Sequence, residues 1–69
     1  MTMEYKGYVS GRIDFDPDDG IISGTVAGLS DVIHFEGTNA SELRASFEGS
    51  IDEYLAICAE KGRTPDNTA

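Results

Sequence analysis

The residues from Tyr8 to Asp16 alternate between apolar and polar side chains. A period of two is typical of a β-strand that is buried on one face and exposed on the other. The pattern therefore predicts a half-buried strand over this segment. Its inward face would carry Val9, Gly11, Ile13 and Phe15, and its outward face Tyr8, Ser10, Arg12 and Asp14.

Two turns are predicted after this strand. The first is Pro17-Asp18-Asp19-Gly20, because proline fixes φ, aspartate side chains hydrogen-bond locally and glycine accepts a positive φ. The second covers residues 27–30, and it leads to a strand over residues 31–37. The apolar positions beyond the first turn are Ile22, Gly24 and Val26, and those beyond the second are Ile33 and Phe35.

The centres of the turns predict the strand pairing. A first turn centred between Asp18 and Asp19 places Phe15 opposite Ile22, Ile13 opposite Gly24, and Gly11 opposite Val26. A second turn centred between Gly28 and Leu29 places Gly24 opposite Ile33, and Ile22 opposite Phe35. Three strands then share one apolar face, on which the glycines would let a covering helix approach closely.

A long helix is expected to follow. Asn39 and Glu42 form an N-cap pair at its start, and Gly62 with Pro65 ends it near Lys61. The apolar residues fall at helical spacing and draw one stripe, namely Leu43, Phe47, Ile51, Tyr54, Leu55 and Cys58. Residues 63–69 have no periodicity and are expected to fray.

These elements predict an α+β fold, a three-stranded antiparallel meander that one long helix covers on one face. We expect a single domain over residues 1–69 with an ordered core over about 5–62. Both outer strands would be sheet edges, and an uncovered edge is either a liability or a docking surface.

Charge narrows the range of partners. The chain has 13 acidic and 5 basic residues, a formal net charge of −8, which repels nucleic acid and attracts basic proteins. Cys58 is the single cysteine, which fits a reducing compartment. The sequence shows neither a secretory signal nor an apolar run long enough for a membrane span. We therefore expect a cytoplasmic protein.

Three segments resemble the HicB-like antitoxin domain. They are residues 13–20 (IDFDPDDG), residues 24–37 (GTVAGLSDVIHFEG), and the helix from Glu42-Leu43-Arg44 through Ile51-Asp52-Glu53-Tyr54-Leu55 to Gly62. The resemblance rests on the order and spacing of the three segments together. The resemblance covers residues 8–65.

The resemblance implies a partial, catalytically degenerate ribonuclease H-like fold. It also implies a role, the neutralisation of HicA, a small basic ribonuclease, by occlusion of its surface. Most family members continue with a fourth strand and a DNA-binding domain, which this sequence lacks. We therefore expect no operator binding by this chain, and the missing fourth strand would leave the edge of the first strand open.

Two groups of acidic residues are candidates for a metal site. Asp14, Asp16, Glu48 and Asp52 invite comparison with the metal-binding acids of a ribonuclease H, but the strand alternation turns the first two away from the helix. The run Asp14, Asp16, Asp18 and Asp19 departs from a calcium loop, whose glycine position holds Asp19 here and whose glutamate position holds Thr25. We expect neither a metal nor a cofactor.

Other candidates have structural interpretations. His34 lies near no nucleophile at a motif spacing, and Cys58 belongs to the apolar stripe. The sequon Asn39-Ala40-Ser41 coincides with the helix cap, and the glycines at positions 20, 24 and 28 precede no helix that could bind phosphate. We therefore expect no catalytic activity.

The acidic surface has a functional interpretation. Asp16, Asp18 and Asp19 at the hairpin tip would attract a basic toxin, while Tyr8 and Val32 would serve as apolar anchors on the face away from the helix. An alternative is a self-associating orphan or regulatory module that forms homo-oligomers through its open strand edge. A third hypothesis is a residual metal-dependent nuclease.

Overall fold

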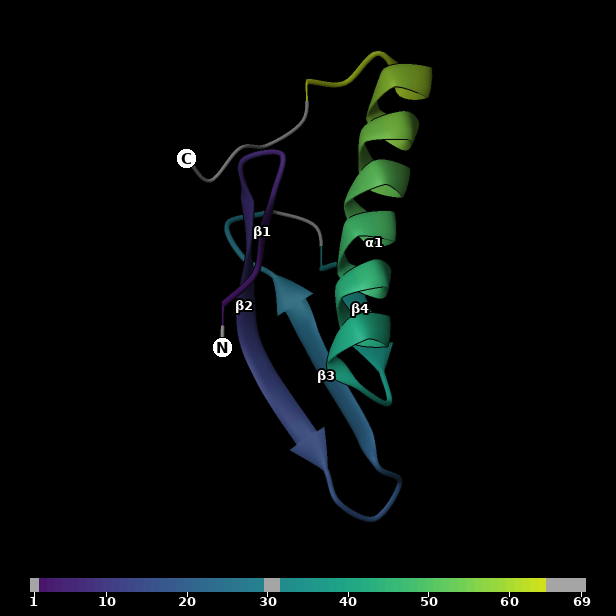
Figure 1. Ribbon diagram of the computed structural model, residues 1–69. Helices are drawn as coiled ribbons and strands as arrows, with labels where there is room; N and C mark the ends of the chain where they lie inside the picture. The colour runs from purple at the N-terminus through teal and green to yellow at the C-terminus, as the bar shows by residue number, and fades with distance from the viewer. Residues whose placement is uncertain (1, 30–31, 65–69) are drawn as a thin grey trace.

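A computed structural model describes residues 2–29 and 32–64. It contains four strands and one helix, which in chain order are β1 (Glu4–Tyr5), β2 (Tyr8–Asp16), β3 (Ile21–Val26), β4 (His34–Gly37) and α1 (Ala40–Lys61). The strands form one antiparallel sheet in the order β1-β2-β3-β4, and α1 packs along one face of it (Figure 1). The predicted α+β class is confirmed, with one strand more than the sequence pattern predicted.

The additional strand β1 forms a tight hairpin with β2. Lys6 and Gly7 connect Tyr5 to Tyr8, and both have positive φ values, 52° and 83°. Two consecutive positive φ values characterise the two-residue turn that matches the twist of a hairpin, and glycine adopts one of them without steric cost. The sheet therefore begins before the alternating segment.

The pairing of β2 with β3 agrees with the predicted register at one end and departs from it at the other. Phe15 pairs with Ile22 and Ile13 with Gly24, as predicted. Between Ser10 and Ile13 the register shifts, so that Val26 lies opposite Ser10 and not opposite Gly11. An extra residue in one strand reverses the faces of all residues beyond it. The predicted inward positions of Val9 and Gly11 are therefore wrong.

The pairing of β3 with β4 is displaced by two residues from the prediction. Gly24 lies opposite Phe35 and Ile22 opposite Gly37. The Val26 amide donates to the Ile33 carbonyl at 3.0 Å, so the connection is longer than the tight turn that the prediction assumed. A displacement of two residues preserves the faces, and Phe35 is buried as expected.

Helix α1 begins and ends where the sequence predicts. The Asn39 side chain accepts a hydrogen bond from the Glu42 amide at 2.9 Å, and Gly62 has a φ of 68° at the C-cap. Glu42 reaches back to Thr38, from whose hydroxyl and amide it accepts hydrogen bonds, and these bonds lower the pKa of Glu42. Side chains therefore accept hydrogen bonds from backbone amides at the start of the helix.

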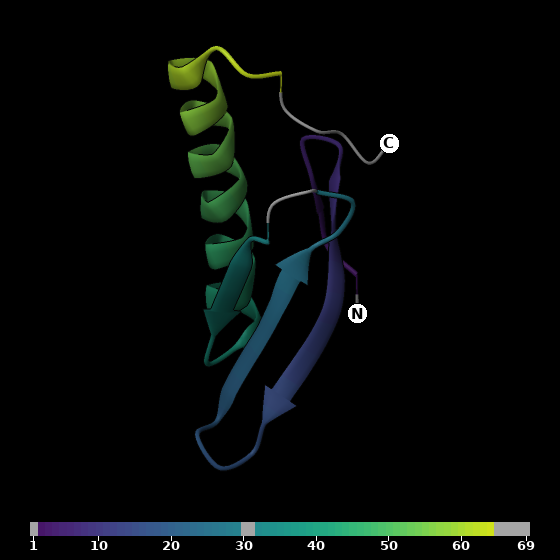
Figure 2. The same cartoon turned by 180° about the vertical axis from the view of Figure 1, so that it is seen from behind.

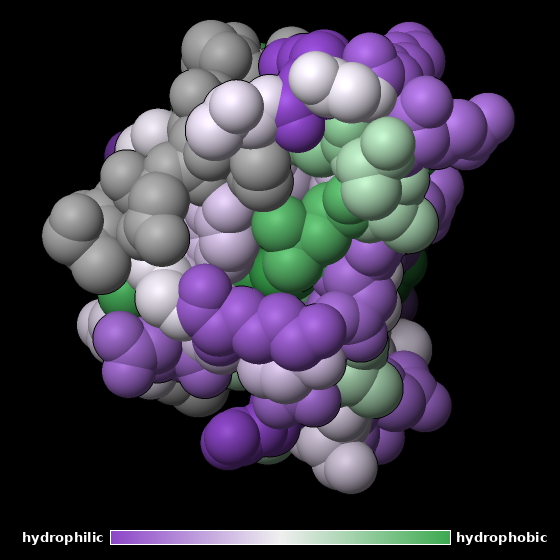
Figure 3. Space-filling view, turned by 90° about the horizontal axis from the view of Figure 1, so that it is seen from above, coloured by the Kyte–Doolittle hydropathy of each residue, from purple (hydrophilic) through white to green (hydrophobic). Residues whose placement is uncertain are grey.

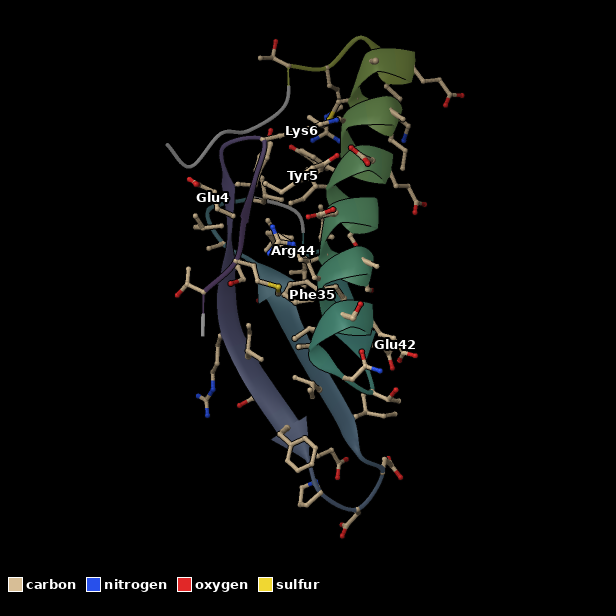
Figure 4. All side chains as sticks on the ribbon, in the orientation of Figure 1. Glu4, Tyr5, Lys6, Phe35, Glu42 and Arg44 are labelled. Atoms are coloured by element: carbon tan, nitrogen blue, oxygen red, sulfur yellow. The ribbon has the colours of Figure 1, made fainter. Side chains whose placement is uncertain are left out.

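The core lies between the sheet and α1. Phe35 packs against Phe47 with ring centroids 5.1 Å apart, and its side chain lies between β4 and the helix (Figure 4). The helix passes close to Gly37, where a Cβ atom would lie 2.5 Å from the Leu43 amide nitrogen. The buried hydrophobic residues are Tyr8, Val26, Phe35, Leu43, Phe47, Ile51, Tyr54 and Cys58.

The β2–β3 hairpin extends beyond the start of α1, as Figure 2 shows from the opposite side. Ile13 is partly buried against the core, whereas Phe15, two residues further along the same face, is 62% exposed. The helix-side face of the sheet is therefore apolar beyond the part that the helix covers. Among the described residues, no helix is long and apolar enough to cross a membrane.

Candidate protein-interaction surface

The hairpin tip presents a group of carboxylates in a fixed turn. Asp16 Oδ1 accepts hydrogen bonds from the amides of Asp18 at 3.0 Å and Asp19 at 3.4 Å. The Asp16 carbonyl accepts from the Gly20 amide at 2.8 Å, and Gly20 has a φ of 68°. Asp16, Asp18 and Asp19 are exposed, as the hypothesis of an acidic docking surface requires.

The predicted outward position of Tyr8 is wrong. Its side chain is 3% exposed and packs edge-on against Tyr54, with ring centroids 6.1 Å apart. Ser10 is also buried, and its hydroxyl accepts a hydrogen bond from the Met3 amide at 2.9 Å. The register shift after Ser10 is the cause, because it turns the first residues of β2 towards the helix. Tyr8 is a core residue and cannot anchor a partner in this conformation.

Val32, the other predicted anchor, is 75% exposed and lies beside a groove of about 240 Å³. Ile57 of α1, 39% exposed, lines the same groove. The remaining lining residues are Ile33, His34, Ser50, Glu53 and Tyr54. Three large hydrophobic residues are exposed in the described part of the chain, and two of them meet in this groove.

The end view of the molecule shows a group of hydrophobic residues with hydrophilic ones along part of its border (Figure 3). An exposed apolar area with a polar border is typical of a surface that binds another protein. The lining of the groove combines the exposed apolar residues Val32 and Ile57 with polar residues, among them the acidic Glu53.

Helix serines cover the outer edge of β4. The Glu36 amide donates to Ser46 Oγ at 3.1 Å, and the Ser50 hydroxyl donates to the His34 carbonyl at 3.3 Å. These are backbone groups that a neighbouring strand would otherwise bind. β4 is an outer strand of the sheet, as predicted, and α1 covers part of its edge. The first predicted strand, β2, is not outermost, because β1 pairs with its start.

Asp52 of α1 holds the β1–β2 turn. It accepts hydrogen bonds from Lys6 Nζ at 2.7 Å and from the Tyr5 hydroxyl at 3.1 Å. The bond to Lys6 lowers the pKa of Asp52, with a smaller effect from Tyr5, and the bond to Asp52 raises the pKa of Lys6. Asp52 thus has a structural partner that the helical pattern did not reveal.

The four carboxylates compared with a ribonuclease H site lie apart. Glu48 pairs with Arg44 at 3.1 Å, and Asp14 pairs with Arg12 at 3.0 Å. Asp16 belongs to the hairpin tip, and Asp52 to the β1–β2 turn contact. In residues 2–29 and 32–64, no group of three or more His, Cys, Asp or Glu side chains is arranged to hold a metal ion.

The other sequence candidates have local roles. Cys58 is buried in the core at 1% exposure, and Asn39 caps the helix, in agreement with their structural interpretations. His34 is an exposed residue of β4 and is among the residues that line the groove. The expected fraying of the tail falls mostly on residues 65–69, which lie outside the described part of the chain.

Sequence reasoning missed Ile57 and Phe15 as surface residues. Ile57 adjoins Cys58 but lies outside the apolar stripe of α1. An isoleucine outside the stripe is a sequence feature that indicates an exposed apolar residue. Phe15 has the correct parity for the core. It is exposed because the β2–β3 hairpin extends beyond the start of the helix. Periodicity does not predict that length.

Comparisons with known proteins add no relative. No family model, no curated protein and no solved structure matches this chain. The likeness to the HicB-like family therefore depends on the sequence motifs described above.

Proposed function

We propose that this chain is an antitoxin-type protein-binding module that neutralises a HicA-like basic ribonuclease by occluding its RNA-binding and active surface. In this role it acts in the cytoplasm by binding, without catalysis or a cofactor. The observation that carries the proposal is the meeting of exposed Val32 and Ile57 in a groove that also contains Glu53. The motif resemblance supplies the class of partner.

Charge and apolar anchors have separate parts in this proposal. A net charge of −8 accelerates the approach of a basic protein and disfavours direct binding of RNA or DNA. Affinity depends on a few buried anchors, for which Val32 and Ile57 are suited once a partner covers them. The acids at the hairpin tip, Asp16, Asp18 and Asp19, would guide orientation.

Co-expression with a tagged HicA-like protein encoded beside the gene tests this proposal. We expect a stoichiometric complex with the unchanged chain, and its loss with Val32→Asp. Ala45→Asp makes the same change of charge at an exposed position of α1 outside the groove, so this variant should retain the complex. The absence of any complex with the unchanged chain would contradict the proposal.

A second candidate is a self-associating regulatory module that works without a toxin. The open part of the β2 edge favours it, since β1 pairs with Tyr8 and Val9 and no other strand of residues 2–29 and 32–64 lies on that side of β2. Self-association without capture of a basic partner would support this candidate over the first.

A further inference from the structure

The outer edge of β2 is covered over only part of its length. β1 pairs with Tyr8 and Val9, and the Ser10 amide donates to the Met3 carbonyl at 2.9 Å. In the sheet order β1-β2-β3-β4, no other described strand lies on this side of β2. The segment from Gly11 to Asp16 therefore borders no strand on its outer side.

The register determines which backbone groups point outwards there. The Val26 amide donates to the carbonyl of Ile33, the residue before β4. The alternation of an antiparallel ladder therefore directs the backbone groups of Ser23 and Ile21 towards β2. Asp14 lies opposite Ser23 and Asp16 opposite Ile21, and these residues use their backbone groups within the hairpin. Ile13 and Phe15 consequently direct their amides and carbonyls away from β3.

The side chains along this edge are divided between two faces. Phe15, at 62% exposure, and the partly buried Ile13 lie on the helix side. The Arg12 and Asp14 side chains on the other face are 86% and 63% exposed and are joined by a 3.0 Å hydrogen bond. An edge that combines unpaired backbone with an exposed aromatic side chain favours the addition of another strand.

We propose that a second copy of this chain adds to the outer edge of β2 as an antiparallel strand over residues 12–16, about a two-fold axis at Asp14. Residues with outward backbone groups must face each other across such a pair. The axis at Asp14 places Ile13 opposite Phe15 of the second copy, and Phe15 opposite Ile13. Both residues then bond through their amides and carbonyls.

The neighbouring register is less favourable. An axis at Ile13 would bring Phe15 opposite Gly11 of the second copy, inside the irregular segment between Ser10 and Ile13. The proposed register also makes the two edges complementary in charge. Arg12 of each copy lies opposite Asp16 of the other copy, on the same face of the sheet, so this pair occurs twice. Opposite charges in facing positions stabilise a strand pair.

One contact in the proposed dimer is unfavourable. Asp14 faces its own copy across the axis, and like charges directly opposite destabilise a strand pair. The segment is short, so the interface falls into the small, weak and transient class. This self-association is independent of the antitoxin proposal, because it needs no basic partner.

Asp14 provides the test, since a wild-type chain and an Asp14→Lys chain would place opposite charges across the axis. Sedimentation equilibrium from ~10 μM to ~1 mM brackets the dissociation constants of weak complexes. We expect wild type to rise above its monomer mass of 7.4 kDa with concentration. An equimolar mixture with Asp14→Lys should associate more strongly than either protein by itself.

Glu60→Lys is the matched control, because it makes the same change of net charge at an exposed position of α1. Its mixture with wild type should associate to a degree between those of its two components. A monomeric wild-type chain at every concentration would overturn the proposal. So would an Asp14→Lys mixture that behaves like the control mixture, because the contact would then lie elsewhere.

Discussion

Tyr8 at the start of β2 and Tyr54 in the third quarter of α1 pack edge to face, with ring planes at 80°. This contact joins the first residues of the alternating strand to the helix. The residue with the opposite parity at the far end of the strand, Phe15, remains 62% exposed. The two aromatic side chains of β2 thus have environments opposite to those that simple alternation predicts.

Alanine substitutions at these two positions should differ widely in effect. Tyr8→Ala removes a buried aromatic ring and should lower the free energy of unfolding by about 3 kcal/mol or more. Phe15→Ala should change it by less than ~0.5 kcal/mol, as for most exposed positions. Urea unfolding at low protein concentration, where self-association is negligible, measures both. Equal losses in the two variants would contradict the described register shift.

Asp52→Asn should lower the melting temperature in a manner that depends on pH. The pKa of Asp52 is lowered by its bond to Lys6, so the carboxylate stabilises the fold above its ordinary pKa of 3.8. That contribution is lost as pH falls through the lowered pKa of the folded state. The difference in melting temperature between wild type and Asp52→Asn should therefore be full at neutral pH and vanish in acid.

Asp18→Asn controls for the removal of one negative charge, since Asp18 lies exposed at the hairpin tip.

On the alkaline side, the raised pKa of Lys6 implies a contribution to the stability of the fold that is present below the ordinary Lys6 pKa of 10.5. This contribution is lost as pH rises through the raised pKa. A pH-independent effect of Asp52→Asn would show that the contact with Lys6 does not stabilise the fold.

Two glycine-to-alanine substitutions should have opposite signs. At Gly37, a Cβ atom would lie 2.5 Å from the Leu43 nitrogen and 2.8 Å from the Glu42 carbonyl carbon, so α1 must move. We expect a loss of about 1–3 kcal/mol, typical of overpacking. At Gly49 in the helix nothing lies within 4 Å, and alanine should add roughly 1 kcal/mol. Thermal unfolding of both variants checks this contrast.

Removal of the two helix serines should expose the edge of β4. Ser46→Ala with Ser50→Ala removes the partners of the Glu36 amide and the His34 carbonyl. Each lost hydrogen bond costs about 1 kcal/mol, and the higher helix propensity of alanine offsets part of this. Hydrogen exchange should accelerate at the Glu36 amide in this variant, but not in Ser41→Ala, whose exposed serine lies in the first turn of α1.

The helix and the central hairpin were predictable from sequence because each depends on local chemistry. Asn39, Gly62 and the apolar stripe determine α1, and the Pro17-to-Gly20 segment determines the turn between β2 and β3. The register shift after Ser10 was not predictable, because both faces of this segment offer side chains that can be buried, Val9 on one and Tyr8 on the other. The packing of Tyr8 against Tyr54 favours the observed choice.

The candidate surface was predictable only in part. The acids of the hairpin tip follow from turn chemistry and charge. Strand parity predicted an exposed Val32, and the side chain is exposed, but its predicted place on the face away from the helix is wrong, because Val32 precedes β4 and lines a groove with Ile57 of α1. The groove depends on how α1 crosses β4, which brings Ile57 beside Val32. Such a contact between distant segments cannot be read from periodicity, and neither can the closure of the β4 edge by Ser46 and Ser50.

The proposed function of this chain is to neutralise a basic ribonuclease by covering its surface. The most direct measurement is a titration of the RNA-cleaving activity of a HicA-like protein encoded beside the gene with the purified chain. We predict that cleavage falls in proportion to the added chain and ceases near equal stoichiometry, with Val32→Asp shifting the titration to higher concentrations. Undiminished cleavage in the presence of excess chain would contradict the account.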